Sequence, residues 1–321
     1  MTASTPRQAQ QESTAAPVLA VDVGGTKIEA ALVDPAGTVI AGTRIRVPTG
    51  AESASSASAF SDALHAAVST AADHPLAAGV ARAGIGAAGP VDLREGTISP
   101  INLPAVHDFD IVGAVKSVTG IEDVRLRLDG TCIALGELWR GAAEGARNAI
   151  AFVVSTGIGG GVIADGRVVT GESGNAGHLG QVVIDSPVDG DVFGATVEGQ
   201  ASGKYAVAWA RQQGWRGETG ENLGADAAAG SEVARAAIER SVQALGKGLA
   251  SAANLLNTEI AVMGGGFSHV TADYAERVQA AARLHSVNAY ARELRVVRAQ
   301  LGRDAPLIGA AALVLRPDLL A

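Results

Sequence analysis

Three glycine-rich turns are the parts of this sequence best suited to hold a phosphate group. The first is Gly-Gly-Thr-Lys at 24–27, which lies between two apolar runs and two residues after Asp22; the others are at 156–161 and 264–266. Glycine has no Cβ atom, so the backbone can turn sharply and approach a ligand closely. The hydroxyl and the ammonium group of the first turn add to its exposed N–H groups, a combination suited to anions. The pattern favours a phosphate site over an ordinary hairpin.

Asp129 is the carboxylate best placed for catalysis. It follows a predicted strand over 124–128 and precedes a predicted helix over 130–143. The dipole of that helix favours a charged carboxylate at its N-terminus. Phosphoryl transfer needs positioning, charge neutralisation and a carboxylate directed at the acceptor hydroxyl. An isolated aspartate at such a place is more often a helix N-cap, so both interpretations stay open at this point.

Two other nucleotide-binding patterns do not fit the sequence. Residues 84–89 match Gly-x-Gly-x-x-Gly, but dinucleotide binding needs a helix after the third glycine, and residues 90–98 predict a strand and a hairpin. The run Gly-x-x-x-x-Gly-Lys-Ser/Thr, which marks P-loop enzymes, does not occur. The glycine turns therefore indicate another kind of nucleotide site.

The elements that would position these turns form a repeat. A strand, a glycine turn, a strand, a short turn and a strand are predicted over 19–40 and again over 150–170. The repeat predicts two similar domains whose glycine turns grip one polyphosphate from opposite sides; a chance likeness between hairpins is the alternative. Periodicity also predicts a returning strand over 38–47 and helices over 57–72, 231–256 and 268–284.

The composition excludes several classes of protein. With 321 residues, of which 47% are hydrophobic, the chain can bury a large core, and two domains are expected. A net charge of -8 argues against nucleic-acid and anionic-membrane partners. The segment 1–16 lacks the apolar core of a signal peptide, so we expect a disordered tail and a cytoplasmic protein. The only cysteine, Cys132, cannot form an internal disulfide.

The ordered set of motifs resembles the ROK group (repressors, open reading frames and sugar kinases) of the actin-like ATPase superfamily. Each motif is weak alone, but together they follow the order of the family from about residue 19 to residue 315. They are Asp22-Val23-Gly24-Gly25-Thr26-Lys27, Asp129 to Glu137, Ser155 to Gly161, Gly177-His178, Glu198 to Gly203, Gly264-Gly265-Gly266 and Gly309-Ala310-Ala311.

This resemblance implies an α/β fold with two ribonuclease-H-like domains and a cleft between them. The expected parts are a disordered tail over 1–17, an N-terminal domain over 18–128 that the C-terminal helix 306–321 joins, and a C-terminal domain over 129–305. A homodimer is also implied. The resemblance predicts no nucleic-acid and no membrane partner, in agreement with the composition.

The implied activity is ATP-dependent phosphorylation of a sugar. Asp129 would be the general base that takes a proton from a sugar hydroxyl, usually the 6-hydroxyl, and Asp22 would face Mg²⁺ through water. The implied substrate-binding residues are Gly89, Asn102, Asn175, His178 and Glu198. The implied cofactor-binding residues are Asp22, Gly24, Gly25, Thr26, Lys27, Thr156, Gly157, Gly265 and Gly266.

The chain departs from the family pattern at two kinds of position. The family usually has Asn before the catalytic Asp and Glu three residues before the motif histidine, whereas this chain has Leu128 and Asn175. These changes favour a modified or amino sugar, or a sugar-like cyclitol, as the acceptor. The cysteines of the family's zinc motif are replaced by Asp189, Asp191 and Thr196, so no structural zinc is expected. The alternative function is a sugar-binding or regulatory ROK protein without turnover.

Overall fold

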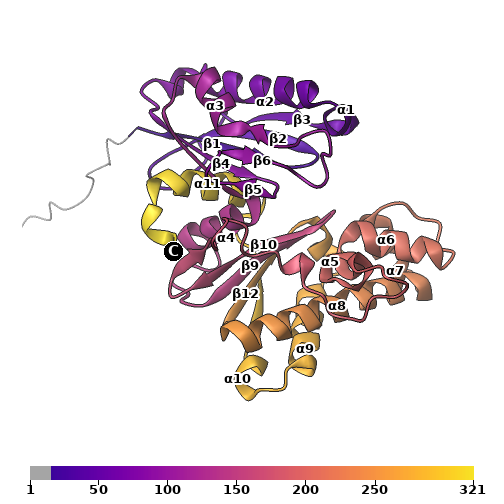
Figure 1. Cartoon of the computed structure of the whole chain (residues 1–321). Coiled ribbons are helices and arrows are strands. Elements are labelled where there is room, and N and C mark those ends of the chain that lie inside the picture. The colour runs from indigo at the N-terminus through magenta and orange to yellow at the C-terminus, as the bar shows by residue number, and fades with distance from the viewer. Residues whose placement is uncertain (1–15) are drawn as a thin grey trace, which may run out of the picture.

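The first half of the chain forms a five-stranded sheet. The computed structural model describes residues 16–321, so the predicted tail over 1–17 lies, apart from its last two residues, outside the described residues (Figure 1). The strand order is β3-β2-β1-β4-β8, in which β1 is antiparallel to β2 and parallel to β4. The strands are β1 (Val18–Val23), β2 (Lys27–Val33), β3 (Ile45–Pro48), β4 (Arg82–Ala87) and β8 (Asp123–Leu128).

The second half builds a sheet of the same design. Its order is β11-β10-β9-β12-β13, with β9 antiparallel to β10 and parallel to β12. The strands are β9 (Ala149–Val154), β10 (Ile158–Ala164), β11 (Arg167–Val169), β12 (Ile260–Gly264) and β13 (Arg295–Arg298). Each half therefore has an antiparallel three-strand meander followed by two parallel strands, which confirms the predicted repeat.

Two helices fill the space between the sheets, as Figure 1 shows: α4 (Asp129–Arg140) and α11 (Ala305–Leu315). Their apolar side chains share one core with residues of both sheets, such as Ala20 of β1 and Ala151 of β9. The C-terminal helix α11 also packs directly on β1 and β4. The helix with Asp129 at its start is thus held between the two halves.

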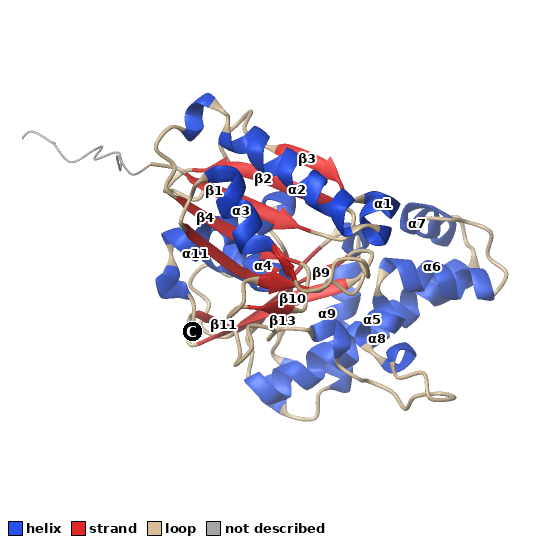
Figure 2. Ribbon diagram, turned by 45° about the horizontal axis from the view of Figure 1, so that its top comes forward, coloured by secondary structure: helices blue, strands red, loops and turns tan. Residues whose placement is uncertain are grey.

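The outer faces of the sheets are covered separately. On the first sheet lie α2 (Ala57–Ala72) and α3 (Ile111–Thr119), and the predicted stripe of α2, with Phe60 and Leu64, is fully buried. The second sheet is covered by a larger group of helices, seen together in Figure 2. These are α5 (Val197–Ala201), α6 (Gly203–Gln212), α7 (Gly220–Ala228), α8 (Glu232–Leu256), α9 (Tyr274–His285) and α10 (Ala289–Arg292).

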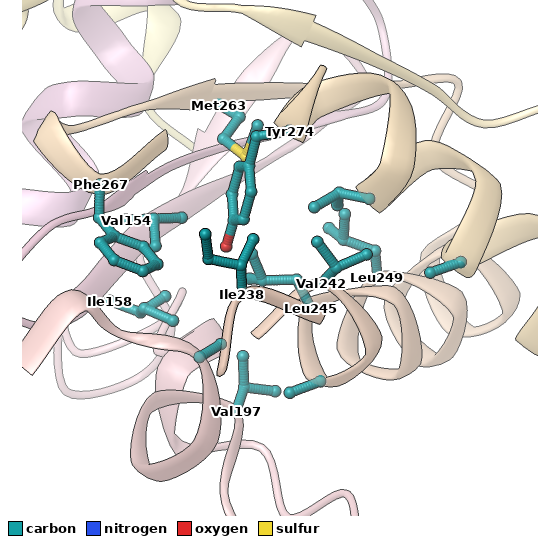
Figure 3. Close-up of a cluster of buried hydrophobic side chains, with 14 of the residues drawn as sticks. Val154, Ile158, Val197, Ile238, Val242, Leu245, Leu249, Met263, Phe267 and Tyr274 are labelled. Atoms are coloured by element: carbon teal, nitrogen blue, oxygen red, sulfur yellow. The ribbon is translucent and has the colours of Figure 1, made fainter. Parts of the chain in front are cut away.

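The core below the second sheet is centred on α8. Figure 3 shows Val242 and Leu245 of this helix facing the side chain of Tyr274. The Tyr274 hydroxyl is buried but shares a 2.6 Å hydrogen bond with the Ser241 hydroxyl, which donates to the Ala201 carbonyl. This bond satisfies a polar group that burial would otherwise make costly. No helix within residues 16–321 is long and apolar enough to cross a membrane.

Small elements complete the fold. They are α1 (Gly50–Ser55) and a three-stranded sheet of β5 (Val91–Asp92), β6 (Thr97–Ile98) and β7 (Phe109–Asp110). The hairpin β5–β6 directly follows β4, so residues 84–89 do not lead into a helix, as the sequence predicted.

Several predicted boundaries were wrong. The strand over 38–47 is reduced to β3, because the Thr43 hydroxyl accepts the N–H of Leu32 and replaces ladder pairing in this segment. The glycine turn over 156–161 is shorter, since 159–161 belong to β10. The helix over 268–284 begins only at Tyr274, after a turn of 3₁₀ helix. Helix α7 was not predicted; its start is fixed by a capping box of Thr219 and Asn222.

Candidate active site

The first glycine turn joins β1 to β2. The N–H of Gly24 donates to the Lys27 carbonyl at 2.9 Å, which closes the turn. A Cβ atom built on Gly25 would overlap the side-chain amide of Asn102. Asn102 therefore lies directly against the turn, and two residues predicted to bind different parts of the ligands are brought together.

The ammonium group of Lys27 has a partner inside the protein. It forms an ion pair with Glu29, whose side chain is only 3% exposed. The Arg46 guanidinium lies 3.6 Å from the other carboxylate oxygen of Glu29. The turn thus presents a cation that a buried carboxylate holds in place, rather than a freely moving one.

Asp22 and Asp129 lie at the same edge of the first sheet. Asp22 is aligned with Gly86 of β4, and Gly86 with Arg127 of β8, two residues before Asp129. β1, β4 and β8 are parallel, and ligands of α/β sheets bind at the carboxyl ends of such strands. The two predicted carboxylates therefore share one edge.

The pKa values of both carboxyl groups are raised. Burial, followed by the charge of Asp129, raises the pKa of Asp22 to about 7. Burial raises the pKa of Asp129 to about 6, although the N–H of Gly130 donates to its carboxylate at 2.6 Å and lowers it. The predicted stabilisation by the helix N-terminus is present but is outweighed by burial. Burial and both carboxylates also raise the pKa of the Cys132 thiol, which agrees with a shared location.

Close backbone packing brings Asp129 towards His178. A Cβ atom on Gly130 would overlap the carbonyl oxygen of Gly160 in β10, and one on Gly177 would lie 2.5 Å from the same oxygen. The residues next to these two glycines, Asp129 and His178, are thus held around one point of β10. Gly161 of the same strand also needs to lack a side chain, because a Cβ atom there would lie 2.8 Å from the Gly130 carbonyl oxygen.

The second glycine turn lies beside Glu198. The N–H of Ile158 donates to the Glu198 carboxylate at 2.8 Å. A Cβ atom on Gly157 would lie 3.0 Å from the same oxygen. Glu198 is carried by α5 and is therefore fixed next to the turn that contains Thr156 and Gly157.

A cleft of about 850 Å³ opens next to this turn. It lies between the turns that follow β9 and β12 on one side and α6 and α7 on the other, and its size suits a small-molecule site. Its lining combines the predicted Thr156 and Gly266 with residues that the sequence did not single out. Those are, among others, Lys204, Arg211, Phe267 and His269.

A hydrogen bond from Arg298 fixes the position of His269, one of the lining residues. The Arg298 guanidinium donates to Nδ1 of His269 at 2.8 Å. With Nδ1 as the acceptor, the hydrogen of the neutral imidazole is on Nε2. The sequence gives no signal for this contact, because His269 ends the 3₁₀ turn after β12 and Arg298 ends β13.

Residues 18–317 match the ROK family, which is nearly the whole chain. The chain belongs to the ROK family. This confirms the family that the ordered motifs indicated.

Relatives of this ROK protein include sugar kinases. It is 34% identical over 252 residues to an N-acetylmannosamine kinase of Citrobacter koseri, a match that covers 77% of this chain and 82% of the relative. A ROK hexokinase from Thermus thermophilus is 33% identical with a TM-score of 0.75, covering 92% of this chain and 96% of the other. A ROK glucokinase from Streptomyces griseus, solved with glucose and AMPPNP, is 27% identical with a TM-score of 0.77, covering 92% and 98%. These likenesses confirm the predicted actin-like fold.

In this ROK protein, hydrogen bonds hold the loop in which the family's zinc cysteines are replaced. The Asp191 carboxylate accepts the N–H of Gly194, and the Thr196 hydroxyl caps α5. Asp189 is exposed in a turn. Asp185 forms a 2.9 Å ion pair with Lys247 of α8. Within residues 16–321 no group of three or more His, Cys, Asp or Glu is placed to hold a metal ion.

The two residues that depart from the family pattern meet at Gly89. A Cβ atom on Gly89 would overlap a methyl group of Leu128 and would lie 3.5 Å from the side-chain oxygen of Asn175. The Asn175 amide is hydrogen-bonded to protein groups on both sides. As a predicted substrate ligand it is therefore already engaged. Asn102 and Glu198 lie against the two glycine turns, Gly89 lies beside Leu128, and His178 follows the glycine that packs on Gly160.

Proposed function

We propose that this ROK protein is an ATP-dependent sugar kinase. It would transfer the γ-phosphoryl group of ATP to a hydroxyl group of a hexose or aminohexose, with the 6-hydroxyl as the expected acceptor. The observation that carries the proposal is the pair Asp22 and Asp129, both with raised pKa values, at the strand edge beside the first glycine turn. Membership of the ROK family and the named kinases among its relatives support it.

Asp129 would act as the general base. Its carboxylate takes the proton of the acceptor hydroxyl while that oxygen forms a bond to the γ-phosphorus, and the bond between this phosphorus and the bridging oxygen of ADP breaks. A pKa of about 6 makes Asp129 a stronger base than an ordinary aspartate and leaves it ionised at neutral pH. The tight packing of Gly130 against Gly160 keeps the carboxylate in position.

The donor would be held from two sides. The turn at 24–27 and the pair Thr156-Gly157 would donate N–H groups to its phosphates. The nucleoside would occupy the 850 Å³ cleft beside Gly265 and Gly266. The cleft is lined by the apolar ring of Phe267, against which the base of a nucleotide could pack. Polyphosphate has no apolar group for this contact, so the ring favours a nucleotide as the donor.

Asp22 would hold Mg²⁺ through water. It is 7% exposed, and no hydrogen bond or ion pair of its carboxylate is found in the described part of the chain, residues 16–321. A carboxylate of this kind fits a cation that keeps its water ligands. The ion would supply charge neutralisation on the phosphates. The bound ion would in turn favour the ionised form of Asp22, whose pKa is otherwise raised to about 7.

We propose an N-acetylated amino sugar as the first acceptor to test. The name of the Citrobacter relative supports this class, and the apolar Leu128 beside Gly89 offers a surface for a methyl group. A coupled assay of ADP release should compare N-acetylmannosamine, N-acetylglucosamine, glucose and a cyclitol. We expect acceptor-dependent release with at least one of them. Sugar binding without turnover on any would favour the regulatory alternative.

The remaining proposals rest on the resemblance. We infer a homodimer in the cytoplasm and two domains with their boundary at 128/129, the C-terminal helix 306–321 belonging to the first. The packing of α11 on β1 and β4 supports that assignment of the helix.

The rate should depend on pH through Asp129. The pKa of Asp129 is about 6, so at lower pH its carboxyl group is protonated and cannot accept the hydroxyl proton. We expect kcat/KM for the sugar to fall about tenfold for each pH unit below 6 and to be level above 7, at saturating Mg²⁺, which favours the ionised form of Asp22. A profile that is flat between pH 5 and 7 would contradict Asp129 as the base.

Gly25→Ala should weaken sugar binding through Asn102. The new methyl group would displace the end of a flexible side chain, so we expect the free energy of unfolding to fall by only about 1 kcal/mol, the low end of the usual cost of overpacking. The KM for the sugar should rise about tenfold, which is about 1.4 kcal/mol. Steady-state kinetics of Gly25→Ala, Asn102→Ala and the double variant form a cycle. Effects that simply add would show that the two residues act independently.

A further inference from the structure

The side chain of Asn175 imitates one rung of a β-ladder. Its oxygen accepts the N–H of Val91 at 2.9 Å, and its nitrogen donates to the Val91 carbonyl at 2.9 Å. The second N–H is directed at Ser173, with its carbonyl at 3.1 Å and its hydroxyl at 3.2 Å. Asn175, 84 positions further along the chain, is thereby joined to the N–H and the carbonyl of Val91 in β5.

The surroundings of this clamp are closely packed. A Cβ atom on Gly174 would overlap the side chain of Leu93, which belongs to the turn of the β5–β6 hairpin. On the other side Gly89 leaves room for Leu128 and the Asn175 oxygen. The loop at 171–178 is therefore seated on the hairpin by shape as well as by hydrogen bonds.

The clamp connects the two halves of the proposed acceptor site. Its loop comes from the second half of the chain and leads to His178, while β5 follows directly after β4 of the first sheet. Gly177 of the loop packs on the same Gly160 carbonyl as Gly130, the neighbour of Asp129. The position of His178 relative to Asp129 thus depends on where the loop rests on the hairpin.

We infer that Asn175 is a positioning residue: its amide locks the loop that carries His178 onto Val91 and so fixes the sugar side of the cleft. This inference rests on the proposed function as far as the sugar is concerned. Both N–H groups and the oxygen of Asn175 are engaged, so its contribution to specificity acts through the loop rather than through a direct bond to a hydroxyl. The clamp also lies apart from the nucleotide cleft, none of whose lining residues belongs to the loop.

Asn175→Asp is the sharpest test of the clamp. The ionised carboxylate keeps the shape of the amide and the acceptor for the Val91 N–H, but it has no donor and would face the Val91 carbonyl with like charge. Ser173→Ala is the matched control, since it removes one partner of the second N–H and leaves both bonds to Val91. This repulsion would move the loop off the hairpin and so break the bond from the Val91 N–H as well. Hydrogen exchange of the Val91 amide at pH 8, without any ligand, should therefore be at least tenfold faster in Asn175→Asp and unchanged in Ser173→Ala.

Kinetics decide whether the clamp serves the sugar. In Asn175→Asp the KM for the acceptor should rise at least tenfold while the KM for ATP stays within twofold, and Ser173→Ala should match the wild type. Equal rises in both KM values, or unchanged Val91 exchange, would overturn the inference. If the wild type turns over no sugar, the proposed function fails, and the exchange experiment still decides whether the clamp exists.

Discussion

Asp129→Asn should lower kcat by about 10²- to 10⁴-fold, the usual contribution of a positioned general base. The amide has the shape of the carboxylate but cannot accept the hydroxyl proton at neutral pH. The KM values for ATP and for the sugar should stay within about threefold, because the hydrogen bond from Gly130 can be kept by the amide oxygen. Steady-state kinetics at pH 7.5 with both substrates varied would measure each parameter.

A control aspartate lies on β8, the strand that leads to Asp129. Asp123, at the start of β8, is an aspartate near the surface that pairs with Arg125 at 3.3 Å. Asp123→Asn should leave kcat unchanged, as expected for an exposed ion pair of small energy. If Asp129→Asn kept more than a tenth of the wild-type kcat, another group would have to serve as the base.

Gly309→Ala should destabilise the protein by about 3 kcal/mol, at the upper end of the usual cost of overpacking. A Cβ atom at this position in α11 would overlap the main-chain carbonyl of Cys132 in α4. A backbone atom cannot move aside as a side chain can, so the two helices between the sheets would have to separate. Urea unfolding followed by circular dichroism gives the free energy of unfolding.

The sign of this effect is diagnostic. Helix propensity alone favours alanine over glycine by about 1 kcal/mol, so a helix with free space around Gly309 would become more stable. Gly159→Ala in strand β10 is the control for the steric clash alone, because a Cβ atom there would have no heavy atom within 4 Å. A stabilised Gly309→Ala variant would contradict the close contact of α4 and α11.

The fold could be predicted where local pattern and tertiary structure agree. The stripe of Phe60, Leu64 and Val68 predicted α2 with its bounds, because the same residues form its buried face. The repeat of strand, glycine turn and strand predicted two similar sheets, because each half builds its sheet in the same order. Asp129 could be placed between a strand and a helix because the local patterns of β8 and α4 agree with the structure.

Features that depend on contacts between distant segments could not be predicted. The glycines of β10 have the appearance of a turn, yet Gly161 is packed against Gly130, and only the packed structure contains that information. Helix α7 has no apolar stripe in the sequence and is held by its cap and by α8. The partner of Asn175 is 84 residues away.

Electrostatics at Asp129 show the same limit. The sequence places the residue at a helix N-terminus, and from this alone a charged form of ordinary or lower pKa is expected. Burial at the sheet edge has the larger effect and raises the pKa to about 6. The carboxyl group of Asp129 is buried because both halves of the chain pack around α4. A local sequence pattern cannot predict this packing.

Phosphorus NMR of the reaction products tests the central claim most directly. Wild-type protein, ATP, Mg²⁺ and the best acceptor of the panel should give ADP and an equal amount of a sugar phosphomonoester, coupled to the protons on carbon 6. Under the same conditions Asp129→Asn should form the same ester at least a hundredfold more slowly. Release of inorganic phosphate in place of the ester, or ester formed equally fast by both proteins, would contradict the account.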